Sequence, residues 1–177
     1  MTRNRTAIRL FIATMILSTV PGLTIAATNT ISAVVPWQGQ GQIFPIGVGK
    51  FRLLGAIEGI MYVETAEGAM NEALVKCPIV QEIDGTSGTS SVTGNCTIVA
   101  SNEDAAFAEI SCEGMSGLCA GTFTLTGGTG RFAGISGSAN MVVRSPVQAL
   151  AADLSDGSVF KMAAGIMQMP VLKITLP

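Results

Sequence analysis

The stretch Ala105-Ala106-Phe107-Ala108-Glu109-Ile110-Ser111-Cys112 decides the fold class of this chain. Its even-numbered residues, from Ala106 to Cys112, are small or apolar, and the odd-numbered positions between them hold Phe107, Glu109 and Ser111. Successive side chains of a β-strand point to opposite faces of a sheet. This period of two therefore predicts a strand with two unlike faces.

Similar short segments, separated by turn residues, recur along most of the chain. Strands are predicted at about residues 50–64, 71–80, 92–101, 105–112, 119–126, 131–144, 158–165 and 168–176. Roughly eight such strands predict an all-β domain. A single antiparallel barrel is the preferred architecture, because closure leaves no unpaired edge, and a β-sandwich is the alternative.

Residues 1–27 have the layout of a cleaved secretory signal peptide. Three arginines precede an uncharged, mostly apolar run at 10–20, and small residues suited to signal peptidase follow at 24–27. The apolar run is too short to span a bilayer, which takes ~20 residues. These features predict export, either to the periplasm or to the outside of the cell.

The chain that remains after cleavage has the size of one domain. Residues 28–47 contain Pro36, Pro45 and several glycines and glutamines, and we interpret them as an irregular N-terminal arm. Residues 48–177 are then the β-barrel domain.

Composition and charge exclude several classes of function. Cleavage leaves seven basic and twelve acidic residues, a net charge of −5, which is unfavourable for contact with nucleic acid. With one Trp and one Tyr, the chain lacks the aromatic girdles of a membrane-inserted barrel. It also has no histidine, the commonest general base and metal ligand. We therefore predict no metal, no cofactor and no stable membrane insertion.

Four cysteines, Cys77, Cys96, Cys112 and Cys119, predict two disulfides in an exported protein. Four cysteines allow three connectivities. Pairing Cys77 with Cys96 and Cys112 with Cys119 is favoured, because each bond then closes a short local loop.

A glycine-rich string follows the strand predicted at 119–126. Gly127, Gly128 and Gly130 are interpreted as a tight hairpin turn that needs positive φ angles, and Gly134 extends this turn motif. The string also resembles the start of a dinucleotide-binding loop, but too few residues follow it to complete such a domain.

The wider segment from Gly121 to Gly137 reads Gly-x-Phe-x-x-x-Gly-Gly-Thr-Gly-Arg-Phe-x-Gly-Ile-x-Gly. It resembles the late hairpin of small exported bacterial proteins that are similar to the allene oxide cyclase and dirigent-type barrels. Residues 76–78, 94–98 and 174–177 fit the same resemblance, which covers residues 48–177. It implies an eight-stranded, calycin-like barrel, often oligomeric, with a central cavity for a hydrophobic molecule. No functional residue of those families aligns with a position here.

Two carboxylates are weak candidates for catalysis. Glu58 and Glu64 lie on or beside an apolar strand, where an inward-pointing carboxyl could move a proton. The plainer interpretation is that both point outward into solvent. Met167 and Met169 share one strand face and could bind Cu(I), although filling the barrel interior is the favoured interpretation.

Three hypotheses of function follow. In the first, the protein is an exported, disulfide-stabilised barrel that binds a small apolar ligand or a partner surface without catalysis. In the second, it is a structural component of the envelope or matrix, with homo-oligomers as the expected assembly. In the third, it is a cyclase-like or isomerase-like enzyme acting on a hydrophobic substrate through Glu58 or Glu64.

Overall fold

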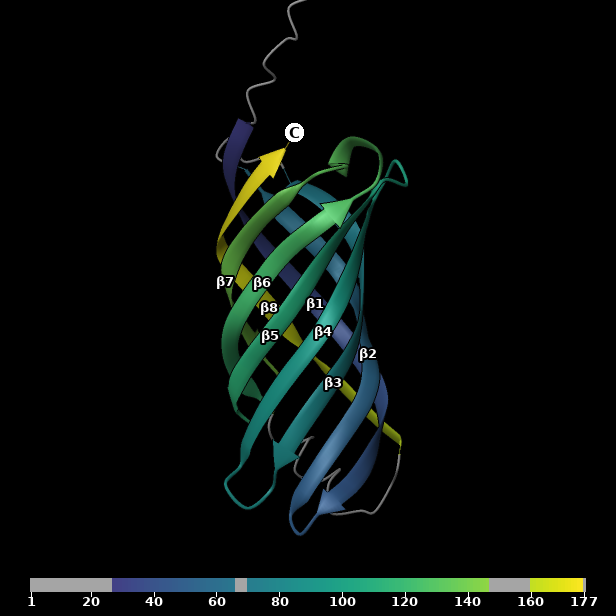
Figure 1. Ribbon diagram of the computed structural model, residues 1–177, viewed down its shortest axis with the longest axis vertical. Coiled ribbons are helices and arrows are strands. Elements are labelled where there is room, and N and C mark those ends of the chain that lie inside the picture. The colour runs from purple at the N-terminus through teal and green to yellow at the C-terminus, as the bar shows by residue number, and fades with distance from the viewer. Residues whose placement is uncertain (1–26, 66–69, 147–159, 177) are drawn as a thin grey trace, which may run out of the picture.

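The computed structural model describes residues 27–65, 70–146 and 160–176, and these form a closed antiparallel barrel of eight strands (Figure 1). Each strand pairs with its neighbours in sequence, and the first pairs with the last to close the barrel. The predicted all-β class and the barrel architecture are confirmed. The strands are β1 Ala27–Gly47, β2 Lys50–Glu64, β3 Met70–Asp84, β4 Thr89–Ala100, β5 Ala105–Met115, β6 Leu118–Gly128, β7 Ser136–Arg144 and β8 Phe160–Leu176.

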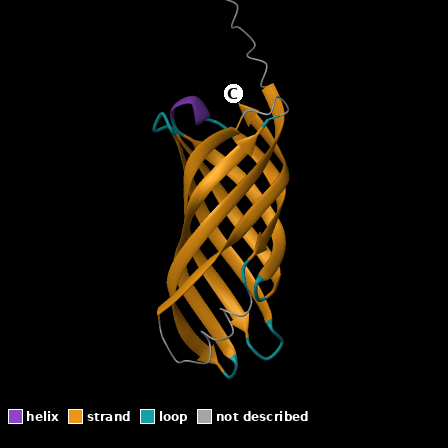
Figure 2. Cartoon of the chain, turned by 180° about the vertical axis from the view of Figure 1, so that it is seen from behind, coloured by secondary structure: helices purple, strands orange, loops and turns teal. Residues whose placement is uncertain are grey.

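In the view of Figure 1, the barrel has an upper and a lower end. The upper end carries the β4–β5 and β6–β7 connections, and the lower end carries the β1–β2, β3–β4 and β5–β6 turns (Figures 1 and 2). The described part of the chain contains one helical element, the short 3-10 turn η1 (Gly130–Phe132) at the upper end.

The interpretation of residues 28–47 as an irregular arm is wrong. These residues belong to β1, the longest strand, which pairs with both β2 and β8. In the ladder with β2, Val34 and Trp37 each have a partner, but Val35 and Pro36 between them have none. A proline has no N–H to donate, so the ladder is interrupted there while the strand continues.

The C-terminal segment also differs from expectation. Two strands were predicted, at 158–165 and 168–176, and the structure has one continuous strand, β8. The register with β1 passes from Ile31↔Leu172 to Ala33↔Met169, which places two residues, Pro170 and Val171, opposite Ser32 alone. This β-bulge accommodates Pro170 without ending the strand. The count of eight strands is correct, although β1 was missed and β8 was divided.

The two faces of β5 differ as predicted, and one of them faces the barrel interior. Ala106, Ala108, Ile110 and Cys112 are all buried, at 2–4% exposure. Met167 and Met169 are inside as well, whereas Met162 is exposed. The favoured interpretation of the paired methionines, that they fill the interior, is confirmed.

The glycine-rich string forms a wider connection than a tight hairpin. It runs from the end of β6 through η1 to Ser136, so the strand predicted at 131–144 begins five residues later than expected. Gly127 and Gly130 have positive φ angles, as predicted. Gly128 does not have a positive φ angle. A glycine is needed there for a steric reason, because a Cβ would lie 2.6 Å from the carbonyl oxygen of Ala105.

Asp104 fastens this connection to the β4–β5 turn. Its carboxylate accepts hydrogen bonds from the backbone N–H of Arg131, at 3.1 Å, and from the Asn102 amide, at 2.6 Å. Beside it, Thr129 and Ala105 bond reciprocally: the Ala105 N–H donates to the Thr129 hydroxyl and the Thr129 N–H to the Ala105 carbonyl. The two upper connections are thereby joined.

We expect Asp104→Ala to lower the free energy of unfolding by about 1–2 kcal/mol, because hydrogen bonds to a charged, partly buried acceptor are lost. Asp104→Asn is the matched control, since it keeps the size and one acceptor oxygen and should lose less. Urea unfolding of the three proteins measures this difference. Equal stability of Asp104→Ala and the unmodified protein would contradict the role given to the carboxylate.

The two disulfides join neighbouring strands. Cys77 on β3 is bonded to Cys96 on β4, with their Cα atoms 4.1 Å apart, and Cys112 on β5 is bonded to Cys119 on β6, at 5.6 Å. The predicted connectivity is confirmed. All four side chains are buried inside the barrel, and two disulfides fit an oxidising location.

Candidate functional site in the barrel interior

The barrel is packed in its middle and hollow toward both ends. The largest fully buried side chains come from five different strands: Val35, Cys77, Phe123, Met141, Met167 and Met169. This layer separates a lower cavity of about 100 Å³ from an upper cavity of about 560 Å³.

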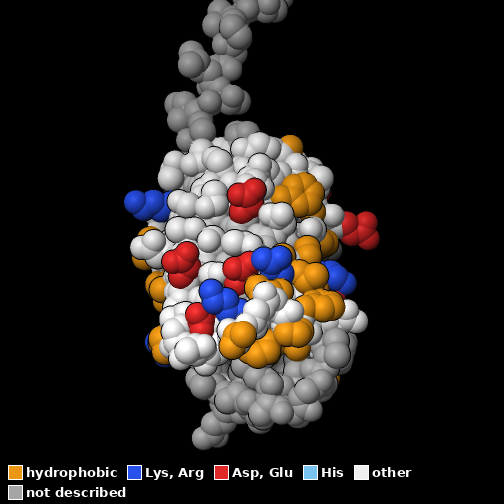
Figure 3. All heavy atoms as spheres, turned by 60° about the horizontal axis from the view of Figure 1, so that its bottom comes forward, with side chains coloured by type: hydrophobic (Ala, Val, Ile, Leu, Met, Phe, Trp, Pro, Cys, Tyr) orange, Lys and Arg blue, Asp and Glu red, His pale blue; other side chains and the backbone are white. Residues whose placement is uncertain are grey.

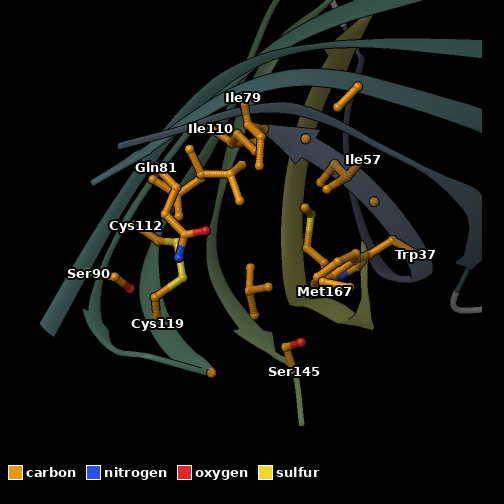
Figure 4. A pocket seen from close by; sticks show the side chains of 18 of the residues that line it. Trp37, Ile57, Ile79, Gln81, Ser90, Ile110, Cys112, Cys119, Ser145 and Met167 are labelled. Atoms are coloured by element: carbon orange, nitrogen blue, oxygen red, sulfur yellow. A yellow bond between two sulfur atoms is a disulfide. The ribbon is translucent and has the colours of Figure 1, made fainter. Parts of the chain in front are cut away.

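Every strand of the barrel contributes to the lining of the lower cavity (Figure 4). One inward-facing residue per strand illustrates this lining: Trp37, Ile57, Ile79, Ser90, Ile110, Cys119, Val143 and Met167, from β1 to β8 in turn. Such a lining follows from the period of two, which turns every second residue of each strand inward. Its wall is mainly apolar.

Only neutral polar groups interrupt this apolar wall. Gln81 and Ser90 point inward near the Cys112–Cys119 disulfide, and the Ser145 hydroxyl donates a hydrogen bond to the carbonyl of Ala164, at 2.7 Å. No Asp, Glu, Lys or Arg is among the described residues that line the cavity. The lower cavity therefore suits uncharged molecules, because a charge inside it would meet no counter-charge.

One buried donor in the wall is left without a partner. The indole N–H of Trp37 is inaccessible to solvent and has no hydrogen-bond partner within the described segments. More than nine in ten buried polar groups in proteins are paired, so this group is an exception that calls for an explanation.

The upper cavity is larger and has a more polar mouth. Its wall includes Met61, Ile98, Phe123 and Leu172, and Glu72 and Arg131 lie at its margin. The buried hydroxyl of Thr65 also lines it, with no hydrogen-bond partner in the described part of the chain.

Glu58 and Glu64 lie outside the barrel. Both are exposed, and they alternate along β2 with inward residues such as Ile57 and Val63. Glu58 pairs with Lys76 of β3, with 2.7 Å between Oε1 and Nζ. Neither carboxyl lines a cavity, so the structure does not bring the two catalytic candidates together with an apolar site.

Within residues 27–65, 70–146 and 160–176, no three His, Cys, Asp or Glu side chains are grouped so that they could hold a metal ion. No helix in these segments has the length and apolar character needed to cross a membrane.

Sequence reasoning missed the cavity residues of β1, because it placed Trp37 in an arm. The signal was present: Ile31, Ala33, Val35 and Trp37 alternate with other residues in the same period of two that identified β5. Gln81 and Ser90 had no such signal, since an inward polar residue looks like any other polar residue of a strand.

Comparison with known proteins gives no match to this chain among protein-family models, curated proteins or solved structures.

Proposed function

We propose that this protein is an exported, disulfide-stabilised barrel that binds a small apolar molecule in its lower cavity without catalysis. The observation that carries the proposal is the cavity itself: it is surrounded by all eight strands and has no charged lining residue in the described part of the chain. Apolar surface moved from water into such a wall is stabilised by about 25 cal/mol per Å².

The size of the cavity limits the ligand. An engineered cavity of about 150 Å³ in another protein holds benzene. In the same proportion, a cavity of about 100 Å³ holds roughly four non-hydrogen atoms. A ligand of five or six such atoms therefore places one end in the cavity and extends toward its opening.

The proposed location is the periplasm or the outside of the cell. The signal peptide proposed at residues 1–27 lies outside the described residues except for Ala27. Support comes from the two disulfides, which persist in oxidising compartments.

The charged side chains on the outer surface support the proposal that the barrel is exposed to water. Acidic and basic side chains are interspersed with apolar ones around the lower end (Figure 3), and the Glu58–Lys76 pair lies on the outer face of β2 and β3. The eight-stranded barrel is also the architecture implied by the resemblance to allene oxide cyclase-like and dirigent-like proteins, and we propose that relationship on this ground.

A cavity-filling variant tests the proposal. In Val92→Phe the larger side chain occupies the lower cavity, so we expect binding of cyclopentane to weaken about tenfold or more. Val63→Phe is the matched control, because the same substitution fills the upper cavity instead and should change binding by less than about twofold. Trp37, the only tryptophan, reports binding through its fluorescence.

Two results would overturn the proposal. The unmodified protein could fail to bind cyclopentane at any soluble concentration, which would favour a structural envelope or matrix component. Alternatively, Val63→Phe could abolish binding while Val92→Phe leaves it intact, which would move the ligand to the upper cavity.

A further inference from the structure

Trp37 occupies a place in the barrel that Gly165 makes available. It is paired with Gly59 on β2 and with Gly165 on β8. A Cβ at Gly165 would lie 2.6 Å from Cζ2 and 2.9 Å from Cε2 of the indole, so no other residue type leaves room for the ring in this position. The indole therefore packs directly on the backbone of β8 and forms part of the lower cavity wall beside Met167 (Figure 4).

The N–H of this ring is the group that packing alone does not account for. Phenylalanine would supply a similar apolar surface without burying a donor, and buried Trp N–H groups usually find a partner. Trp37 lines a mainly apolar cavity, and its N–H is closed to solvent and has no partner among the described residues. A ligand atom therefore reaches this N–H only when the indole or its neighbouring side chains shift. A water molecule needs two to four polar partners, and most of the surrounding wall is apolar.

We propose that the ligand of the lower cavity is a neutral molecule with an oxygen acceptor, of the carbonyl class, that receives the hydrogen bond of the Trp37 indole N–H. This inference rests on the proposed function and adds the polarity of the ligand to it. The apolar part of the ligand contacts side chains such as Ile57, Ile110 and Met167. Its oxygen faces β1, and its lack of charge matches a lining without ionic groups.

Two probes of equal size separate the hydrogen bond from simple burial. Cyclopentanone and methylenecyclopentane each have six non-hydrogen atoms and differ in one group, C=O against C=CH₂. Because water solvates the ketone better, their affinities are compared as a ratio, first in the unmodified protein and then in Trp37→Phe, which keeps an aromatic ring and removes the donor. We expect the affinity for cyclopentanone, divided by that for methylenecyclopentane, to be about three- to tenfold lower in Trp37→Phe than in the unmodified protein.

A second measurement uses the unmodified protein alone, so it does not depend on the folding of the variant. The single tryptophan produces one indole N–H signal in a ¹H–¹⁵N correlation spectrum. We expect saturation with cyclopentanone to move this proton signal downfield, as hydrogen bonding does. Methylenecyclopentane should cause no such downfield shift.

The outcomes distinguish the two levels of the proposal. If both probes bind with an unchanged ratio in Trp37→Phe and no downfield shift occurs, the acceptor inference is overturned and the apolar site survives. If neither probe binds the unmodified protein, the proposed function fails and the inference fails with it. If Val63→Phe abolishes the binding of both probes, the ligand lies in the upper cavity and Trp37 is not its partner.

Discussion

Replacing Gly121 with alanine is expected to lower the free energy of unfolding by about 3 kcal/mol. An added Cβ would overlap the carbonyl oxygen of Ser111 and would lie 2.5 Å from the Cα of Cys112. Both are backbone atoms of β5, so no side-chain rotation relieves the contact. The Cys112–Cys119 bond, two residues away from Gly121 along β6, also limits how far the two strands can separate.

Gly47→Ala provides the matched control for this prediction. A Cβ at Gly47 would have its nearest neighbour 3.8 Å away, which is ordinary contact, and the φ angle of this residue is not positive. We expect a change within about 0.5 kcal/mol, or a slight gain from the reduced freedom of the unfolded chain. Urea unfolding measures both variants, and equal midpoints would contradict the steric role of Gly121.

Removing the Cys77–Cys96 bond, by changing both cysteines to alanine, is expected to cost about 3 kcal/mol. Removing Cys112–Cys119 in the same way should cost about 2 kcal/mol. The difference arises because the two bonds close loops of different length. The cysteines of the first bond are 19 residues apart in the sequence, and those of the second are 7 residues apart. In the chain-entropy account, the longer loop restricts the unfolded chain more.

The two double variants serve as controls for each other, since each removes two buried sulfur atoms. Thermal unfolding should show a decrease in Tm of about 6–12 °C for the Cys77–Cys96 variant, at 2–4 °C for each kcal/mol. A larger loss for the Cys112–Cys119 variant would show that local packing, and not loop length, sets the contribution of each bond. Reduction of the unmodified protein with a thiol should reproduce the combined loss.

The candidate site shows where pattern reading stops. Hydropathy along β5 and β6 identifies inward residues, but it does not reveal that the middle of the barrel is packed while its ends are hollow. That distribution depends on the sizes of side chains that meet from different strands, such as Phe123 of β6 and Met141 of β7. Glu58 illustrates the same limit, because only the β2–β3 register places it opposite Lys76 on the outside.

The sequence by itself determined the all-β class and the two unlike faces of β5, and it favoured the disulfide connectivity that the structure has. These properties are local: a period of two follows from the geometry of one strand, and short loops favour neighbouring cysteines as partners. Only the tertiary structure showed that the alternation at residues 31–37 belongs to a strand that spans Ala27–Gly47, that β8 continues through Pro170, and that Trp37 borders a cavity. These depend on pairing between segments more than a hundred residues apart, as between β1 and β8, where partner strands and a bulge override the local preferences of proline and glycine.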